Sequence, residues 1–192
     1  MEQIGYVIMA AGNARRFGDN KLTAELQGRS LIQRAMEAVP TESFDRVVVV
    51  TQYPEIMRLA EEFHFASVHN PHPELGISHT LQLGLTGLRD CGGVLFSVAD
   101  QPLLRRETVA KLTKLWQSQP EKIAALSCSS TRGNPCIFPA RFFPELMDLE
   151  GDRGGSAVIR KHENDLVLLE TAAEELYDVD TAAALELLKT NV

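Results

Sequence analysis

Short apolar runs rich in β-branched residues alternate along the chain with segments in which apolar residues recur at helical spacing. Such runs are typical of buried parallel strands that are connected by helical crossovers. The runs that predict strands are residues 4–9, 46–51, 65–69, 93–98, 123–127 and 166–169. The alternation predicts an α/β fold, a three-layer sandwich in which helices cover a mostly parallel central sheet.

Polar and special residues mark where the predicted helices begin. Ser30 and Thr181 are suited to cap helix N-termini, and Pro54 is suited to the first turn of a helix. Ser78 is expected to cap a helix whose apolar face includes Leu81. The stretches 70–81 and 131–139 interrupt the alternation and are expected to contain functional loops. Because there is no linker and no useful repeat, residues 1–192 are expected to form a single domain.

Composition narrows the class of protein. The 192 residues are 44% hydrophobic, and a chain of this length can bury about 70% of its unfolded surface, so a disordered chain is excluded. The three cysteines show no CxxC spacing and predict free thiols in a reducing compartment. The sequence contains no apolar run of the about 20 residues that cross a bilayer and no basic leader, so we expect a cytoplasmic protein with no membrane partner.

The net charge of −7 is unevenly distributed. Residues 1–161 contain 18 basic and 18 acidic residues, whereas residues 162–192 contain eight acidic residues and Lys189 as the single basic one. Nucleic acids and anionic membranes are bound by basic patches, so neither is expected as the main partner. The neutral body of the chain remains compatible with small anionic substrates.

The loop after the first predicted strand, residues 10–21, contains small residues, two glycines and three cations. Small residues allow the backbone to approach a ligand closely, and Arg and Lys beside free N–H groups suit a polyphosphate. The patterns GxGxxG and GxxxxGK[ST] are both absent, which argues against a Rossmann dinucleotide site and a P-loop. A plain strand-to-helix loop with solvated cations is the structural alternative.

Acidic residues occur at two further positions that suggest a metal. Asp100 follows an apolar strand, where its carboxylate would point into a ligand crevice at the sheet edge. Asp178 and Asp180 alternate across Val179 and would face the same side of an extended segment, where a cation could separate their charges. An Asp-Pro type turn and a solvated helix start are the respective alternatives.

A resemblance gives these features a common interpretation. The segment 10–21 resembles the N-terminal signature of nucleotidyltransferases with the GT-A-like fold, and further matches, in the family's order, indicate the MocA-like molybdenum cofactor cytidylyltransferases. The signature residues are Ala10, Ala11, Gly12, Arg16, Gly18 and Lys21. The further matches are Asn70-Pro71, Gly76-Ile77-Ser78, Ala99-Asp100-Gln101-Pro102, Arg132-Gly133 with Pro135, Gly151-Asp152 and Asp178-Val179-Asp180-Thr181.

The resemblance implies roles for particular residues. The catalytic residues would be Arg16, Lys21 and Asp100, and the metal Mg²⁺ would be held by Asp100, Asp178 and Asp180. The nucleotide-binding residues would be Ala10, Ala11, Gly12, Arg16, Lys21, Asn70, Gly76, Ser78 and Asp100. This chain departs from the family at Asn134, where His is usual, and at Ser156, where Arg is frequent. Both positions would face the pterin substrate.

The reaction that the resemblance implies is transfer of CMP from CTP to the terminal phosphate of molybdopterin cofactor, with release of pyrophosphate. A molybdenum hydroxylase would then receive the product. Ala11, where related guanylyltransferases tend to have glycine, favours CTP because its methyl group could crowd a purine. The alternatives are a molybdenum cofactor guanylyltransferase, a sugar-phosphate or methylerythritol-phosphate cytidylyltransferase, and a noncatalytic cofactor carrier.

Overall fold

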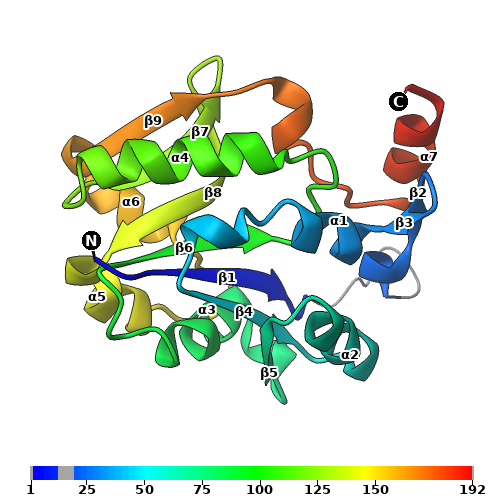
Figure 1. The fold of residues 1–192 in the computed structure, drawn as a ribbon, viewed down its shortest axis with the longest axis horizontal. Helices are drawn as coiled ribbons and strands as arrows, with labels where there is room; N and C mark the ends of the chain where they lie inside the picture. Colours follow the sequence, from blue (N-terminus) through cyan, green and yellow to red (C-terminus); the bar gives the residue numbers. More distant parts are fainter. Residues whose placement is uncertain (1, 13–19, 192) are drawn as a thin grey trace.

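A seven-stranded sheet forms the centre of the computed structural model, which describes residues 2–12 and 20–191 (Figure 1). Its strands follow the order β5-β4-β1-β6-β8-β7-β9, and β8 is antiparallel to both of its neighbours whereas the other pairs are parallel. The strands are β1 (Ile4–Ala10), β4 (Arg46–Thr51), β5 (Ala66–His69), β6 (Gly93–Val98), β7 (Ile123–Cys128), β8 (Thr131–Pro139) and β9 (Leu166–Glu170). A small separate hairpin pairs β2 (Glu25–Leu26) with β3 (Arg29–Ser30).

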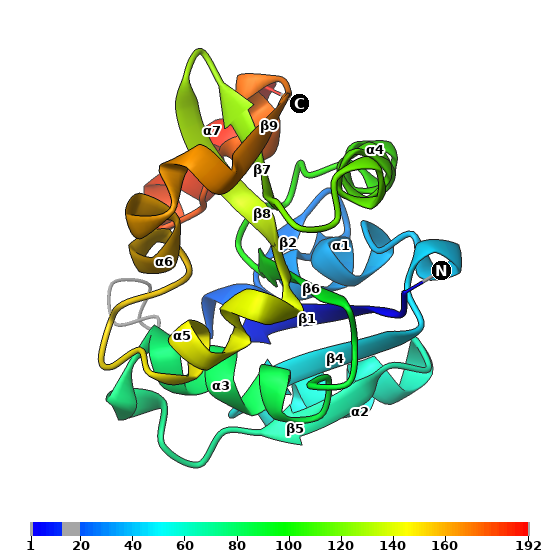
Figure 2. The ribbon, with the colours of Figure 1, turned by 90° about the vertical axis from the view of Figure 1, so that its left-hand side faces the viewer.

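Helices cover both faces of this sheet, which confirms the predicted α/β sandwich with a mostly parallel centre (Figure 2). The first layer consists of α1 (Leu31–Glu37), α2 (Pro54–Glu62) and α4 (Arg106–Ser118). The second consists of α3 (Ile77–Thr86), α5 (Phe143–Met147) and α6 (Ser156–Lys161). Because side chains alternate along a strand, Tyr6 and Ile8 of β1 enter the first core and Val7 enters the second.

All six predicted strands are present, with boundaries that differ from the prediction by at most one residue at each end. Predicted helix starts are confirmed at Ser30, whose hydroxyl accepts from Gln33 N at 3.2 Å, and at Pro54 in the first turn of α2. Thr181 caps α7 (Ala182–Asn191) by accepting from Ala184 N at 3.1 Å. No helix among the described residues is long and apolar enough to cross a membrane.

The stretch 131–139 was expected to be a loop, and this expectation is wrong. It forms β8, a strand between β6 and β7. The pairing places Cys136 opposite Ala125 and Gly133 opposite Leu126, so Asn134 and Pro135 form an insertion between two ladder positions. A proline cannot donate to a ladder, and this bulge accommodates it inside the sheet.

The stretch 70–81 contains more regular structure than expected. It includes a short 3-10 helix, η3 (Pro73–Leu75), and α3 begins at Ile77. The expectation that Ser78 caps this helix is also wrong, because the N-cap position belongs to Gly76 and has no side-chain cap. Ser78 is instead buried in the first turn, and its backbone N–H donates to Gly151 O at 3.1 Å.

Candidate active site

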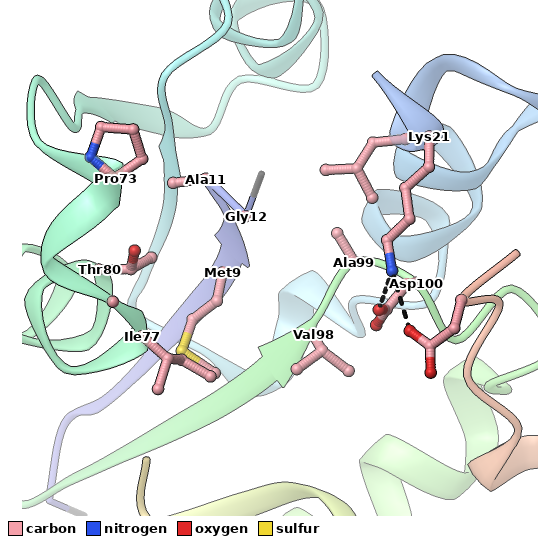
Figure 3. Close-up of a pocket in the computed structure, with 13 residues that line it drawn as sticks. Met9, Ala11, Gly12, Lys21, Pro73, Ile77, Thr80, Val98, Ala99 and Asp100 are labelled. Atoms are coloured by element: carbon pink, nitrogen blue, oxygen red, sulfur yellow. Dashed lines mark hydrogen bonds and ion pairs between the residues drawn. The ribbon is translucent and has the colours of Figure 1, made fainter. Parts of the chain in front are cut away.

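A cavity of about 440 Å³ opens beyond the carboxyl ends of β1 and β6. Ala11 and Gly12 continue from β1 into its wall, and Ala99 and Asp100 continue from β6. Figure 3 shows Lys21 and Asp100 at one end of this cavity, and Pro73, Ile77 and Thr80 at the other. The cavity therefore has a charged end and a less polar end, at the edge where ligands bind to open α/β sheets.

At the charged end, Lys21 lies between two carboxylates. Its Nζ atom lies 2.7 Å from Asp100 Oδ2 and 3.3 Å from Asp180 Oδ1, and Figure 3 draws both contacts as dashed lines. Burial of the ammonium lowers the pKa of Lys21, but the hydrogen bonds and charges of Asp100 and Asp180 outweigh this effect, so the pKa is raised above 10.5. Lys21 therefore carries a positive charge at neutral pH.

Local structure brings these three residues together from distant parts of the chain. Lys21 begins a short 3-10 helix, η1 (Lys21–Thr23), which Asn20 caps by accepting from Leu22 N at 3.2 Å. Asp100 follows the end of β6, and its backbone carbonyl accepts from Val179 N at 2.9 Å. This backbone hydrogen bond ties the segment that carries Asp180 to the end of β6.

Asp178 occupies a different environment from its neighbour Asp180. Its side chain does not line the cavity, and its pKa is raised, first by desolvation and then by the negative charge of Asp100. Within the described residues, no group of three His, Cys, Asp or Glu side chains is arranged to hold a metal ion. Of the three predicted metal ligands, Asp100 and Asp180 both contact Lys21. Asp178 lies near them but does not line the cavity.

Asn70 supports the opposite wall of the cavity from a fully buried position. Its Nδ2 atom donates to Thr80 Oγ1 at 3.0 Å, and its Oδ1 atom accepts from His72 N at 2.9 Å. Thr80 lines the cavity, whereas Asn70 and Ser78 do not. The structure therefore gives Asn70 a position behind the wall, although the sequence suggested direct nucleotide contact.

Gly76 lines the cavity in a conformation that requires glycine. Its φ is +88°, and a Cβ atom there would lie 2.4 Å from both C and O of Gly151. The loop that contains Gly151 is therefore packed directly against the start of α3. This close contact explains why the position is occupied by glycine.

The loop after β1 is held by two residues that the sequence did not suggest. Gln52 Nε2 donates to Ala11 O at 2.9 Å, and Tyr53 Oη donates to Gly12 O at 3.2 Å. Both follow β4 at its carboxyl end, so the strand-end rule could have identified them. Ala10 is buried behind this loop and does not line the cavity. Arg16 and Gly18 lie outside the described residues.

A second cavity of about 290 Å³ adjoins the first, because Met9 and Ile77 line both. Its walls combine the aromatic rings of Phe96 and Phe138 with polar and charged groups. The polar and charged residues among its lining are Asn134, Asp152, Arg153, Ser156 and Arg160. The bulge in β8 places Asn134 here, and Arg153 lies in the same wall as Ser156.

The chain is similar in sequence to curated bacterial proteins. PucB of Bacillus subtilis, a purine catabolism protein, is 27% identical to the chain over 196 residues, which cover 95% of this chain and 94% of PucB. A probable molybdenum cofactor guanylyltransferase of the same organism is 26% identical over 144 residues, with 74% of this chain and 70% of that protein covered.

The fold matches that of solved nucleotidyltransferases. A nucleotidyl transferase from Methanothermobacter thermautotroptrophicus superposes with a TM-score of 0.82 at 18% identity, over 98% of this chain and 97% of its own. The fold is thus the predicted GT-A-like nucleotidyltransferase fold. The model of the MobA-like NTP transferase domain matches residues 6–166, most of the chain. The chain belongs to the family of MobA-like NTP transferase domains.

Proposed function

We propose that this protein transfers CMP from CTP to the terminal phosphate of a molybdopterin-type cofactor, with Mg²⁺ as the metal. The observation that carries the proposal is Lys21 between Asp100 and Asp180 at the charged end of the cavity, 2.7 and 3.3 Å from their oxygens. Cations and carboxylates so close together suit a triphosphate and its counter-ion. The relation to a molybdenum cofactor guanylyltransferase supports the pterin as acceptor.

The proposed reaction is a displacement at phosphorus. An acceptor phosphate oxygen forms a bond to the α-phosphorus of CTP. The bond from that phosphorus to the oxygen that leads to the β-phosphorus breaks, and its electron pair leaves with pyrophosphate. Because the acceptor is already an anion, no strong general base is needed. The chain must instead reduce the repulsion between two anions and stabilise the charge of the leaving group.

Lys21 is suited to this task because its ammonium has three N–H donors and two of them face carboxylates. The third donor can bind a phosphate oxygen. Arg16, which lies outside the described residues, is proposed to act on the same phosphates. Desolvation at the half-buried Lys21 strengthens its attraction to a phosphate.

The donor set at the charged end also fits Mg²⁺, which prefers oxygen ligands. Asp100 and Asp180 already bind one cation, the Lys21 ammonium, through one oxygen each. These two carboxylates would hold the metal, with Asp178 close enough to add negative charge. Bound Mg²⁺ would neutralise charge on the triphosphate and on the departing pyrophosphate.

The pair of adjoining cavities supports a reaction of two substrates. The first would take the nucleotide, with its phosphates near Lys21 and its base toward Pro73 and Thr80. The second would take the pterin, since Phe96 and Phe138 offer apolar surface and Arg153 and Arg160 offer charge for a phosphate. Met9 and Ile77 lie in both walls, so bound substrates would meet there.

CTP is the proposed nucleotide because Ala11 lines the first cavity and its methyl group leaves less room for a purine. The guanylyltransferase relative keeps GTP as the second candidate. A molybdenum hydroxylase as the recipient of the product, and the cytoplasm as the location, remain part of the proposal.

Pyrophosphate release tests the proposal directly. Purified protein is mixed with molybdopterin cofactor, Mg²⁺ and either CTP or GTP, with Asp100→Asn as the control variant. Release that depends on the cofactor and is faster with CTP supports the proposal. Faster release with GTP would indicate a guanylyltransferase, and release only with a sugar phosphate or methylerythritol phosphate would indicate another transferase. Tight cofactor binding without release would indicate a carrier.

A further inference from the structure

A third, small hydrophobic core lies apart from the two cores that flank the sheet. Its buried members are Leu26, Leu31, Val179 and Leu185, and Ala24, Leu103 and Leu188 pack against them. It fills the space between the hairpin of β2 and β3 and helix α7, which lie side by side in Figure 1. We call this group of residues the third core.

The third core joins the three segments that carry the charged residues of the site. Ala24 follows Lys21 by three positions, and Leu103 follows Asp100 by three positions. Val179 directly precedes Asp180. Each of the three charged side chains is thus attached to this core by a short stretch of backbone, although the segments are far apart in the sequence.

Val179 holds the most direct of these connections. Its side chain is fully buried in the third core, and its N–H donates to Asp100 O at 2.9 Å. Asp178 and Asp180 on either side are exposed. The buried side chain and this hydrogen bond therefore anchor the backbone directly before Asp180, whose Oδ1 lies 3.3 Å from Lys21 Nζ.

We propose that Val179 is a positioning residue, which sets Asp180 opposite Asp100 across Lys21 by packing into the third core. The family model ends at residue 166, so this role concerns a segment outside the matched region. The inference rests on the proposed function for its catalytic consequence. It does not depend on which nucleotide or acceptor is used.

The matched experiment compares Val179→Ala with Val49→Ala. Val49 is also fully buried, but it lies in the middle of β4 in the first core. Both substitutions remove the same two methyl groups, and both should lower the melting temperature. A merely structural role for Val179 would make the two variants equivalent in every other measurement.

The distinguishing measurement is the affinity of the substrate-free protein for Mn²⁺. Water-proton relaxation detects the bound ion. We expect Val179→Ala to weaken Mn²⁺ binding by about tenfold, and Val49→Ala to leave it unchanged. In an Asp180→Asn background, Val179→Ala should have no further effect on Mn²⁺ binding, because the residue acts through Asp180. Equal Mn²⁺ affinity of Val179→Ala and Val49→Ala, or no Mn²⁺ binding by the unmodified protein, would overturn the proposal.

Pyrophosphate release separates this inference from the proposed function. If Mn²⁺ binding responds to Val179→Ala but no nucleotide is turned over, the positioning role stands and the proposed reaction fails. If turnover occurs and the Mn²⁺ concentration for half-maximal turnover is the same in Val179→Ala as in Val49→Ala, the reaction stands and the positioning role fails.

Discussion

Lys21 Nζ lies 2.7 Å from Asp100 Oδ2, although 79 positions separate the two residues in the sequence. The contact joins the start of η1 to the end of β6, and it lies in the wall of the larger cavity. A half-buried ion pair stabilises a fold little more than well-packed apolar residues would, because desolvation offsets much of the attraction. We therefore interpret the pair as a feature of the site's chemistry, and the following predictions test that interpretation.

Replacement of Lys21 should affect turnover more than folding. Lys21→Gln keeps a polar side chain but removes the charge from between Asp100 and Asp180. Loss of one such electrostatic group lowers kcat by about 100-fold or more. Steady-state pyrophosphate release measures this change. The matched control is Lys189→Gln, which breaks an ion pair with Glu186 on α7 and should leave kcat unchanged. A Lys21→Gln variant with unchanged kcat would contradict the assignment.

The raised pKa of Lys21 predicts a pH dependence of stability. The folded protein holds this proton more tightly than the unfolded chain, whose Lys pKa is near 10.5. The contact therefore contributes stability below pH 10.5, and this contribution is lost as pH rises through the higher folded-state pKa. Thermal unfolding of wild type and Lys21→Gln from about pH 8 to about pH 11.5 tests this. The difference between their melting temperatures should change only at the alkaline end of this range. A change centred below pH 10 would contradict the raised pKa of Lys21.

The aspartates should differ in importance. Asp100→Asn and Asp180→Asn each remove a carboxylate that contacts Lys21. Each should raise the Mg²⁺ concentration for half-maximal turnover by about 10-fold to 100-fold. Asp178→Asn should have a smaller effect, because Asp178 does not line the cavity. Titration of turnover with Mg²⁺ measures all three variants. A larger effect of Asp178→Asn than of Asp180→Asn would reverse the ranking.

The effect of Asp178 on stability should also depend on pH. The direction should be opposite to that of an acid in a favourable ion pair. Its pKa is raised by desolvation and then by Asp100, so its ionised form is disfavoured in the folded state. This penalty is present above the raised pKa and disappears as pH falls below 3.8, the usual value for Asp. Asp178→Asn should thus be as stable as wild type or more stable at neutral pH. Thermal unfolding would contradict this if the variant were clearly less stable.

Gly76→Ala should destabilise the protein and distort the cavity wall. The added Cβ would lie 2.4 Å from the Gly151 carbonyl, and the φ of +88° disfavours any side chain. Together these effects should lower the free energy of unfolding by about 2 kcal/mol or more. Gly87→Ala is the control, because its φ is −82° and no atom lies within 4 Å of the added Cβ. Chemical denaturation should find Gly87→Ala close to wild type; equal losses in both variants would refute the steric explanation.

The sequence was sufficient for most of the fold because the short β-branched runs indicate buried strands without reference to distant residues. It was insufficient for β8, where Pro135 and Gly133 suggest a loop and only the bulge opposite Ala125 and Leu126 allows a strand. Ser78 was misplaced for a similar reason. The contact between Gly76 and Gly151 sets the start of α3, and that contact is not visible in the local pattern.

For the site, the strand-end rule identified Asp100, and the motif identified Lys21. The contact of Lys21 with Asp180, and the position of Asn70 behind the wall, depend on side chains that approach from distant segments. Gln52 and Tyr53 follow β4 at its carboxyl end, so the same rule that identified Asp100 could have found them. Only the structure shows that Asp180 lines the cavity whereas Asp178 does not.

The most direct test of the central claim is transfer of label from CTP that carries ³²P in its α-phosphate. With molybdopterin cofactor and Mg²⁺ present, wild-type protein should move the label into a cofactor-linked dinucleotide, and Asp100→Asn should do so far more slowly at the same Mg²⁺ concentration. Absence of labelled product with wild type, or equal labelling by Asp100→Asn, would contradict the claim that Lys21 and its aspartates form a nucleotidyl transfer site.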